Sequence, residues 1–261
     1  MGFSEGFVEA DGFRVRYAEA GEGEPLVHLH GAGGMRLTPA HELLSRQRRV
    51  IALEAPGFGE SPANERSATM ADLARSVNLA LAALGLERYT PWGTSFGGKL
   101  ALFMALDRPE AIESLVLESP AAIRPEGHVR PAGGPEQTAA LLYAHPERQP
   151  PRPRLDPAVL AKQEALVARL MGPNHDPALE DHLAEIEART LVLFGTEDKM
   201  IPPEMGAVYK ERMKRCSLIL VYDAGHAIAA DRPEAFAGLV GDFLDRQERF
   251  IVSAEPSVLQ P

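Results

Sequence analysis

Residues 91–100, "PWGTSFGGKL", combine residue types that two kinds of chemistry use. Residues 93–99 match G-x-x-x-x-G-K, the pattern of a loop that holds phosphates. Residues 93–97 match G-x-S-x-G, the pattern of a nucleophile elbow centred on Ser95. Both loops connect a strand to a helix, so the neighbouring residues do not distinguish a phosphate site from a serine nucleophile.

The phosphate-binding hypothesis lacks one of its functional groups. Such a loop needs a Ser or Thr hydroxyl directly after its lysine, because that oxygen binds the magnesium ion. Leu100 occupies the position after Lys99. An apolar side chain cannot bind the metal, so the sequence disfavours a nucleotide site and makes Lys99 a residue of the helix surface.

The elbow hypothesis is favoured by residues elsewhere in the chain. Glycines at 93 and 97 let a strained turn approach neighbouring backbone while Ser95 points outward. An earlier glycine-rich loop, "HGAGG" at residues 30–34, can present N–H groups to a developing oxyanion. The expected oxyanion-hole donors are the backbone N–H groups of Ala32 and Phe96.

An acid and a histidine follow the serine in the chain order that an elbow requires. Asp198 lies in "FGTEDKMIP", just past a buried strand, and His226 lies in "DAGHAIAADRPEAF", past the last strand. We expect Ser95 to be the nucleophile, His226 the base that takes its proton, and Asp198 the acid that orients the imidazole. Glu118, at the end of another strand, and Glu197 are the alternative acids.

Other polar residues carry weaker signals. His28 and His30 share one face of a strand, but no carboxylate or cysteine follows at ligand spacing. We therefore expect a core histidine at 28, a support for the glycine-rich loop at 30, and neither a metal nor a cofactor. Cys216 is expected to be a packing residue. The candidates to meet an anionic substrate are Arg36, Arg124 and Arg130.

Strands and helices alternate along most of the chain. An Asp-Gly pair at 11–12 indicates a hairpin. The buried strands "PLVHLH", "RVIAL", "YTPW", "IESLVLES", "TLVLFG" and "SLILVY" alternate with helices near residues 39–46, 70–84, 96–106, 203–214 and 233–249. Short strand–helix units favour the α/β class, with a parallel sheet covered on both faces.

The alternation stops between residues 121 and 187. Stretches rich in Pro and Gly, such as "RPEGHVRPAGGPEQ", interrupt helical ones there. We expect residues 1–120 and 188–261 to form one core domain, and residues 121–187 to be a helical insertion. The last residues, "SAEPSVLQP", are expected to be a loosely held tail.

Together these motifs resemble those of the α/β-hydrolase superfamily. The resemblance runs from about residue 3 to residue 248, through "HGAGG", "EAPGFGES", "GTSFGG", "FGTEDKMIP" and "DAGHAIAADRPEAF" in the family's order. It implies an eight-stranded mostly parallel sheet with flanking helices, and a cap (lid) over the site at 121–187. Dehalogenases and epoxide hydrolases of this superfamily carry Asp at the elbow, so Ser95 disfavours an Asp nucleophile.

The composition excludes several function classes. The 261 residues are 45% hydrophobic and 25% charged, which is typical of soluble globular proteins. A formal net charge of −10 disfavours nucleic acid and anionic membranes as partners. One cysteine cannot form an internal disulfide, and no signal peptide or membrane span is evident, so the expected location is the cytoplasm. The sequence does not indicate an oligomeric state.

We expect an enzyme that acts on a small-molecule substrate through an acyl-enzyme on Ser95. A small to medium, mostly apolar carboxylic ester is the leading prediction. The same residues allow two alternatives: hydrolysis of a carbon–carbon bond in a diketone-like substrate, and a non-catalytic ligand receptor on the same fold. The cap is expected to select among substrates.

Overall fold

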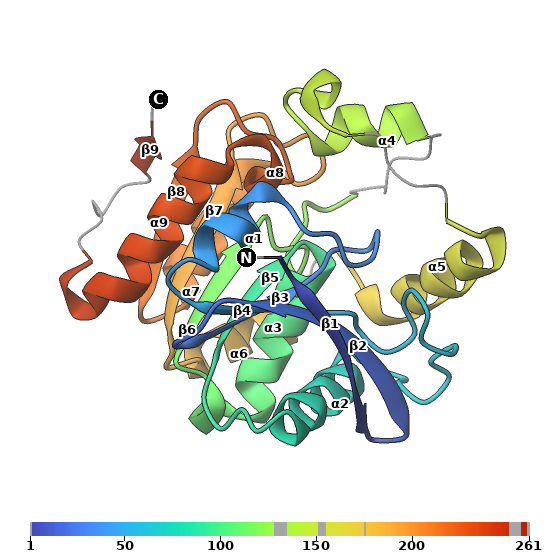
Figure 1. Cartoon of the computed structure of the whole chain (residues 1–261). Coiled ribbons are helices and arrows are strands. Elements are labelled where there is room, and N and C mark those ends of the chain that lie inside the picture. The colour runs from blue at the N-terminus through green and yellow to red at the C-terminus, as the bar shows by residue number, and fades with distance from the viewer. Residues whose placement is uncertain (1, 128–134, 151–154, 175, 251–256, 260–261) are drawn as a thin grey trace.

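Nine strands form one mixed sheet, in which the second strand runs antiparallel to both of its neighbours and the other described strand pairs are parallel (Figure 1). The computed structural model describes residues 2–127, 135–150, 155–174, 176–250 and 257–259. The strand order is β1-β2-β4-β3-β5-β6-β7-β8-β9. The strands are Ser4–Ala10 (β1), Phe13–Ala20 (β2), Pro25–Leu29 (β3), Arg49–Leu53 (β4), Thr90–Thr94 (β5), Ser114–Glu118 (β6), Arg189–Gly195 (β7), Cys216–Val221 (β8) and Ser257–Leu259 (β9).

Strands β1 to β8 confirm the expected eight-stranded, mostly parallel sheet of the α/β class. The short strand β9 adds a ninth and pairs in parallel with β8. Part of the tail that was expected to be loose is therefore hydrogen-bonded to the sheet.

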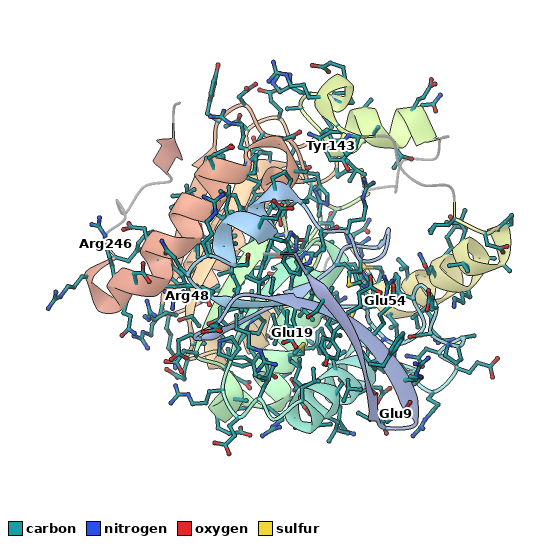
Figure 2. The ribbon with its side chains drawn as sticks, in the orientation of Figure 1. Glu9, Glu19, Arg48, Glu54, Tyr143 and Arg246 are labelled. Carbon is teal, nitrogen blue, oxygen red and sulfur yellow. The ribbon has the colours of Figure 1, made fainter. Side chains whose placement is uncertain are left out.

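The antiparallel strands β1 and β2 form a tight hairpin. Ala10 pairs with Phe13, and the two residues between them, Asp11 and Gly12, have φ angles of 48° and 75°. Positive φ at both positions matches the right-handed twist of paired strands and is tolerated best by Asp-Gly and Asn-Gly. Glu9 lies near the tip of this hairpin (Figure 2). The Asp-Gly signal in the sequence therefore located the turn correctly.

Apolar cores cover both faces of the sheet. On one face, helix α2 (Met70–Ala83) packs against helix α3 (Phe96–Asp107). On the other, helix α1 (Pro39–Leu44) packs against helix α9 (Pro233–Arg246), and Trp92 lies in their cluster (Figure 1). Burial on both faces explains why parallel strands are continuously apolar rather than alternating.

The parallel strands β3, β5, β6, β7 and β8 end at the same edge of the sheet. The carboxyl ends of parallel strands form the usual ligand site of such folds. This edge collects the segments that carry the sequence-predicted site residues. They are the "HGAGG" loop after β3, Ser95 after β5, Glu118 at the end of β6, Asp198 after β7 and His226 after β8.

The described residues between β6 and β7 form helices and turns, with no strand among them. The helices are α4 (Pro135–Leu142), α5 (Pro157–Met171) and α6 (Pro177–His182). The side chain of Asp156 accepts the N–H of Ala158, and Pro157 occupies the first turn, so α5 begins with two standard start signals. Helix α4 lies above α8 (Ile228–Asp231), whereas α5 lies on the side of the hairpin (Figure 1). Within the described ranges, no helix combines the length and apolar composition needed to cross a membrane.

Candidate active site

Ser95 occupies a strained turn between β5 and α3. Its φ and ψ are 55° and −111°, a conformation that costs a non-glycine residue free energy. The two flanking glycines permit the turn. A Cβ on Gly93 would lie 2.3 Å from the carbonyl oxygen of Gly97, and a Cβ on Gly97 would lie 1.9 Å from that of Leu29. The geometry is that of a nucleophile elbow, in which the serine side chain is lifted away from the strand.

Lys99 is buried, and this corrects the expectation of a helix-surface residue. Its exposed fraction is 2%, and its Nζ donates to the carbonyl oxygen of Met171 at 2.6 Å. Burial lowers the pKa of the Lys99 ammonium. The physical reason is that the end of α5 lies against α3, so a helix face that a bare sheet would expose is covered. The Lys99 ammonium thus binds the carboxyl end of α5 and is not free to bind a phosphate.

His226 and Asp198 form a buried pair. The Nδ1 of His226 lies 2.9 Å from the Oδ2 of Asp198, and the two side chains are 3% and 0% exposed. The other carboxylate oxygen accepts the N–H groups of Met200 and Ile201 at 2.8 and 2.9 Å. These bonds fix the carboxylate, and its contact with Nδ1 directs the imidazole proton to that nitrogen. Glu197 is exposed.

The second imidazole nitrogen of His226 has no partner in the described part of the chain. Its Nε2 is buried and makes no hydrogen bond, and the hydroxyl of Ser95 makes none to any residue that the structure describes. The structure therefore brings both residues to one cavity without a direct bond between them. Such bonds are often long in an unliganded site and tighten when substrate binds.

The N–H groups of Ala32 and Phe96 donate to no acceptor among the described residues. Both residues line the same cavity as Ser95. Gly31 passes close to the serine, since a Cβ on it would lie 3.5 Å from the Cβ of Ser95. Two N–H groups without acceptors beside the Ser95 side chain could stabilise the negative charge of an oxyanion by hydrogen bonding.

The cavity has a volume of about 660 Å³. Its floor includes Ser95 and His226, and the insertion contributes an apolar wall. Tyr143 of this wall lies beneath α4, on the side facing the body of the molecule (Figure 2). Leu166 and Leu170, by contrast, pack into the main core. The apolar wall residues from the insertion are Ala121, Leu141, Leu142, Tyr143, Pro150, Val167 and Met171.

Comparison with known proteins identifies the family. A family model described as "alpha/beta hydrolase fold" matches residues 24–139. A dihydrolipoyllysine-residue acetyltransferase component of an acetoin cleaving system from Cupriavidus necator is 30% identical, over 90% of this chain and 67% of that protein. The chain belongs to the α/β-hydrolase superfamily. The resemblance drawn from the five motifs is thereby confirmed.

Two further relatives of this α/β-hydrolase indicate the range of its neighbours. A 2-hydroxy-6-oxo-6-(2'-aminophenyl)hexa-2,4-dienoic acid hydrolase from Metapseudomonas resinovorans is 25% identical, over 94% of this chain and 92% of that protein. A solved structure of a bacterial membrane phospholipase A is 27% identical with a TM-score of 0.74, over 94% of this chain and 86% of that one. Hydrolases of different substrates thus share this fold.

Two arginines of this α/β-hydrolase line the cavity. The Nη1 of Arg36 is buried and has no hydrogen-bond partner among the described residues. Arg124 donates from Nη2 to the carbonyl oxygens of Gly172 and Pro173, and its buried Nε has no partner there. Desolvation lowers the pKa of the Arg124 guanidinium. Arg130, the third candidate from the sequence, lies outside the described residues.

His28 and His30 are core histidines whose ring nitrogens are all engaged within the protein. His30 contacts the carbonyl oxygen of Gly31 at 2.7 Å and accepts the N–H of Ala55 at 3.1 Å, so it supports the glycine-rich loop. His28 lies 3.2 Å from Thr94 and 3.0 Å from His41. Neither histidine has a nitrogen free for a metal. Cys216 is buried, which raises the pKa of its thiol to about 12, as suits a packing residue.

The sequence reasoning missed a hydrogen-bonded group beside the site. Thr94 donates to Glu118 at 2.6 Å, and Trp92 donates to the same carboxylate at 3.0 Å. One available signal was the strand period, which places residues 92 and 94 on the same face of β5. No sequence signal indicated that His41 of α1 would contact His28, which in turn contacts Thr94, because that contact depends on how α1 packs.

Proposed function

We propose that this protein is a serine hydrolase that forms an acyl-enzyme on the Oγ of Ser95. The observation that carries the proposal is the state of His226. Its Nδ1 is held by Asp198, and its buried Nε2 offers a free lone pair to the cavity that Ser95 also lines. A neutral imidazole in this tautomer can take the serine proton during attack and return it to the leaving group.

The proposed oxyanion hole consists of the N–H groups of Ala32 and Phe96. Attack on a carbonyl carbon moves negative charge onto its oxygen, and two preorganised donors stabilise that charge most in the transition state. Asp198 stabilises the imidazolium that forms at the same moment. Water then attacks the acyl-enzyme with His226 as base, and Ser95 is regenerated.

We assign residues 121–187 as a cap over this site. The support is that apolar side chains from α4 and α5 line the cavity opposite Ser95. Their shape and hydrophobicity would select the part of the substrate that does not react.

The favoured reaction is hydrolysis of a carbon–carbon bond next to a ketone. The Metapseudomonas resinovorans relative acts, by its name, on a 2-hydroxy-6-oxo-hexadienoic acid, which contains no ester. A hydrolase can cleave such a compound beside its 6-oxo carbon, because tautomerisation of the 2-hydroxy-diene lets the distant 2-oxo group receive the departing electrons. Ser95 would acquire the acyl group and the leaving carbon would acquire a proton. The unpaired Nη1 of Arg36 would suit the carboxylate of this substrate class.

An ester substrate is the second candidate. The apolar wall formed by residues of α4 and α5 suits an acyl or aryl group and requires no charge on the substrate. A non-catalytic receptor is less well supported, because Ser95, His226 and Asp198 together supply a complete catalytic set.

Labelling and kinetics test the proposal together. A fluorophosphonate is expected to label Ser95 stoichiometrically, and Ser95→Ala is expected to lower kcat roughly a thousandfold or more on aryl esters and on a 2-hydroxy-6-oxo-dienoate. Ser45→Ala is the matched control, since Ser45 lies outside the cavity lining. Labelling at another residue, or full turnover by Ser95→Ala, would refute the mechanism.

A further inference from the structure

A buried carboxylate at the end of β6 has no role in the mechanism above. Glu118 is 1% exposed and forms no ion pair in the described part of the chain. Its Oε1 accepts the N–H of Ala229 at 2.8 Å. Its Oε2 accepts the indole N–H of Trp92 at 3.0 Å and the hydroxyl of Thr94 at 2.6 Å. Such donors replace the water that an interior carboxylate has lost.

The hydrogen bonds behind Thr94 run in one direction along the cavity wall. The N–H of Thr38 can only donate, so His41 Nδ1 accepts it and His41 carries its proton on Nε2. That proton goes to Nδ1 of His28 at 3.0 Å, and His28 then donates from Nε2 to Thr94 at 3.2 Å. The hydroxyl proton of Thr94 is left for Glu118. Every donor in this chain therefore points toward the Glu118 carboxylate.

Both histidines are neutral, as this direction requires. Burial lowers the pKa of His41 to about 3 and holds the pKa of His28 well below its ordinary value. The carboxylate itself is best satisfied when ionised, since protonation would add a fourth donor among three groups that already donate to it. The pKa of Glu118 is nevertheless raised above its ordinary value, because the effect of burial exceeds that of the three donors, which lower it.

Glu118 contacts both of the segments that must meet for catalysis. Its backbone carbonyl oxygen accepts the N–H of Ser95 at 2.9 Å, and its side chain holds Thr94, the residue before the nucleophile. Ala229, its third contact, lies in α8 directly beyond His226. Glu118 is therefore hydrogen-bonded both to the turn that carries Ser95 (the nucleophile turn) and to the segment that follows His226 (the base loop).

We propose that Glu118 is a positioning residue, whose ionised carboxylate holds the turn carrying Ser95 and the helix following His226 at a fixed separation. The proposal rests on the serine hydrolase mechanism above. The charge has a second effect, because Glu118 and a protonated His226 attract each other. The same attraction stabilises the imidazolium that forms as Ser95 is deprotonated.

The variant Glu118→Gln tests this role with almost no change of shape. If its amide oxygen faces Trp92 and Thr94, its NH2 meets the N–H of Ala229. If the amide is turned over, its NH2 meets the indole N–H of Trp92. Either orientation leaves a buried donor without an acceptor.

We expect Glu118→Gln to lower kcat for aryl esters about tenfold to a hundredfold, with KM changed by less than about threefold. The acidic limb of the kcat/KM pH profile should move to lower pH by roughly half a unit, because a lost negative charge makes the imidazolium easier to deprotonate. The other carboxylates of this loop and cavity, Asp198, Asp223, Asp231 and Glu164, stay in place. A purely structural role would not move this limb.

A second pair of variants isolates the hydroxyl link. Thr94→Ser keeps a donor for Glu118 and is expected to keep kcat within about threefold of wild type, whereas Thr94→Val removes the donor and is expected to lose about tenfold. Glu54→Gln is the control for loss of a buried carboxylate. Glu54 is 4% exposed and lies outside the cavity lining, so this variant should lose stability while kcat and the pH profile stay unchanged.

Three results would overturn the positioning role. They are wild-type kcat and pH profile in Glu118→Gln, equal activity of Thr94→Val and Thr94→Ser, or loss of turnover in Glu118→Gln while Asp198→Asn stays active. The last result would make Glu118 the triad acid. Turnover that persists in Ser95→Ala would instead refute the hydrolase mechanism itself, so the two failures are distinguishable.

Discussion

At the scale of single residues, the site contains polar groups that are buried without partners. Nε2 of His226 and Nη1 of Arg36 both lack hydrogen bonds in the described residues, although both line the cavity. Leaving a buried polar group unpaired costs about 1–3 kcal/mol, so such atoms are rare unless a ligand completes them. In the proposed mechanism, the partner of His226 would be the hydroxyl of Ser95 or the leaving group, and the partner of Arg36 would be an anionic substrate group.

Arg36 should therefore discriminate between acidic and neutral substrates. We expect Arg36→Met to lower kcat/KM for a 2-hydroxy-6-oxo-dienoate about tenfold or more, while kcat/KM for a neutral aryl ester changes less than about twofold. Steady-state kinetics on both substrates checks this. Arg148→Met is the control, since Arg148 is exposed and absent from the cavity lining. Equal losses on the two substrates would argue against a carboxylate at Arg36.

At the scale of elements, hydrogen bonds join the proposed cap to the loop of His226 and to α3. The N–H of Ala227, next to His226, donates to the carbonyl oxygen of Leu142 at 3.0 Å. Oδ2 of Asp231 accepts the N–H groups of Ala144 and Gly225, each at 2.8 Å. The carboxyl end of α5 is held by Lys99 and Arg124. The wall of the cavity and the base loop are thus one connected structure.

The packing of α3 against β3 depends on one glycine. A Cβ at Gly97 would lie 1.9 Å from the backbone oxygen of Leu29, and neither backbone can yield without moving the nucleophile turn. We expect Gly97→Ala to lose about 3 kcal/mol or more of unfolding free energy. Urea denaturation measures this. Gly238→Ala in α9 is the control, because a Cβ there has no atom within 4 Å and should stabilise the helix by about 0.5–1 kcal/mol.

Elements whose signals are local were predictable from the sequence. The local residue types predict the local backbone conformation in three cases: strand runs such as "TLVLFG", the Asp-Gly turn, and the glycines around Ser95. Strand order then placed Asp198 and His226 at one edge of the sheet. The burial of Lys99 and the hydrogen bond from Ala229 to Glu118 were not predictable, because they join segments whose contact depends on how the insertion and α8 pack on the sheet. Strand β9 is only three residues long, too short for a periodic signal.

At the scale of the whole molecule, three neutral histidines lie in the core behind the site. His28, His30 and His41 are 5%, 3% and 1% exposed. Burial lowers the pKa of His30 to about 4 and of His41 to about 3, from an ordinary value of 6.5, and that of His28 also falls. The folded state therefore binds fewer protons than the unfolded state below pH 6.5. The three histidines therefore leave the free energy of unfolding at its full value above pH 6.5, and that free energy falls as the pH falls toward their pKa values in the folded state.

Acid should consequently unfold this protein well before its carboxylates are neutralised. Between pH 6.5 and pH 5, His30 and His41 should each remove roughly 1.5 kcal/mol of unfolding free energy, since a pH unit is worth about 1.4 kcal/mol for a whole proton and the unfolded imidazole is half protonated at pH 6.5. Urea midpoints measured across this range should fall steeply. His41→Gln should be less stable at pH 7 but have a shallower slope, because one titrating group is gone. His182→Gln, at an exposed histidine paired with Glu185, should leave the slope unchanged. A wild-type slope in His41→Gln would mean that His41 is already protonated in the fold, in which case its Nδ1 could not accept the N–H of Thr38.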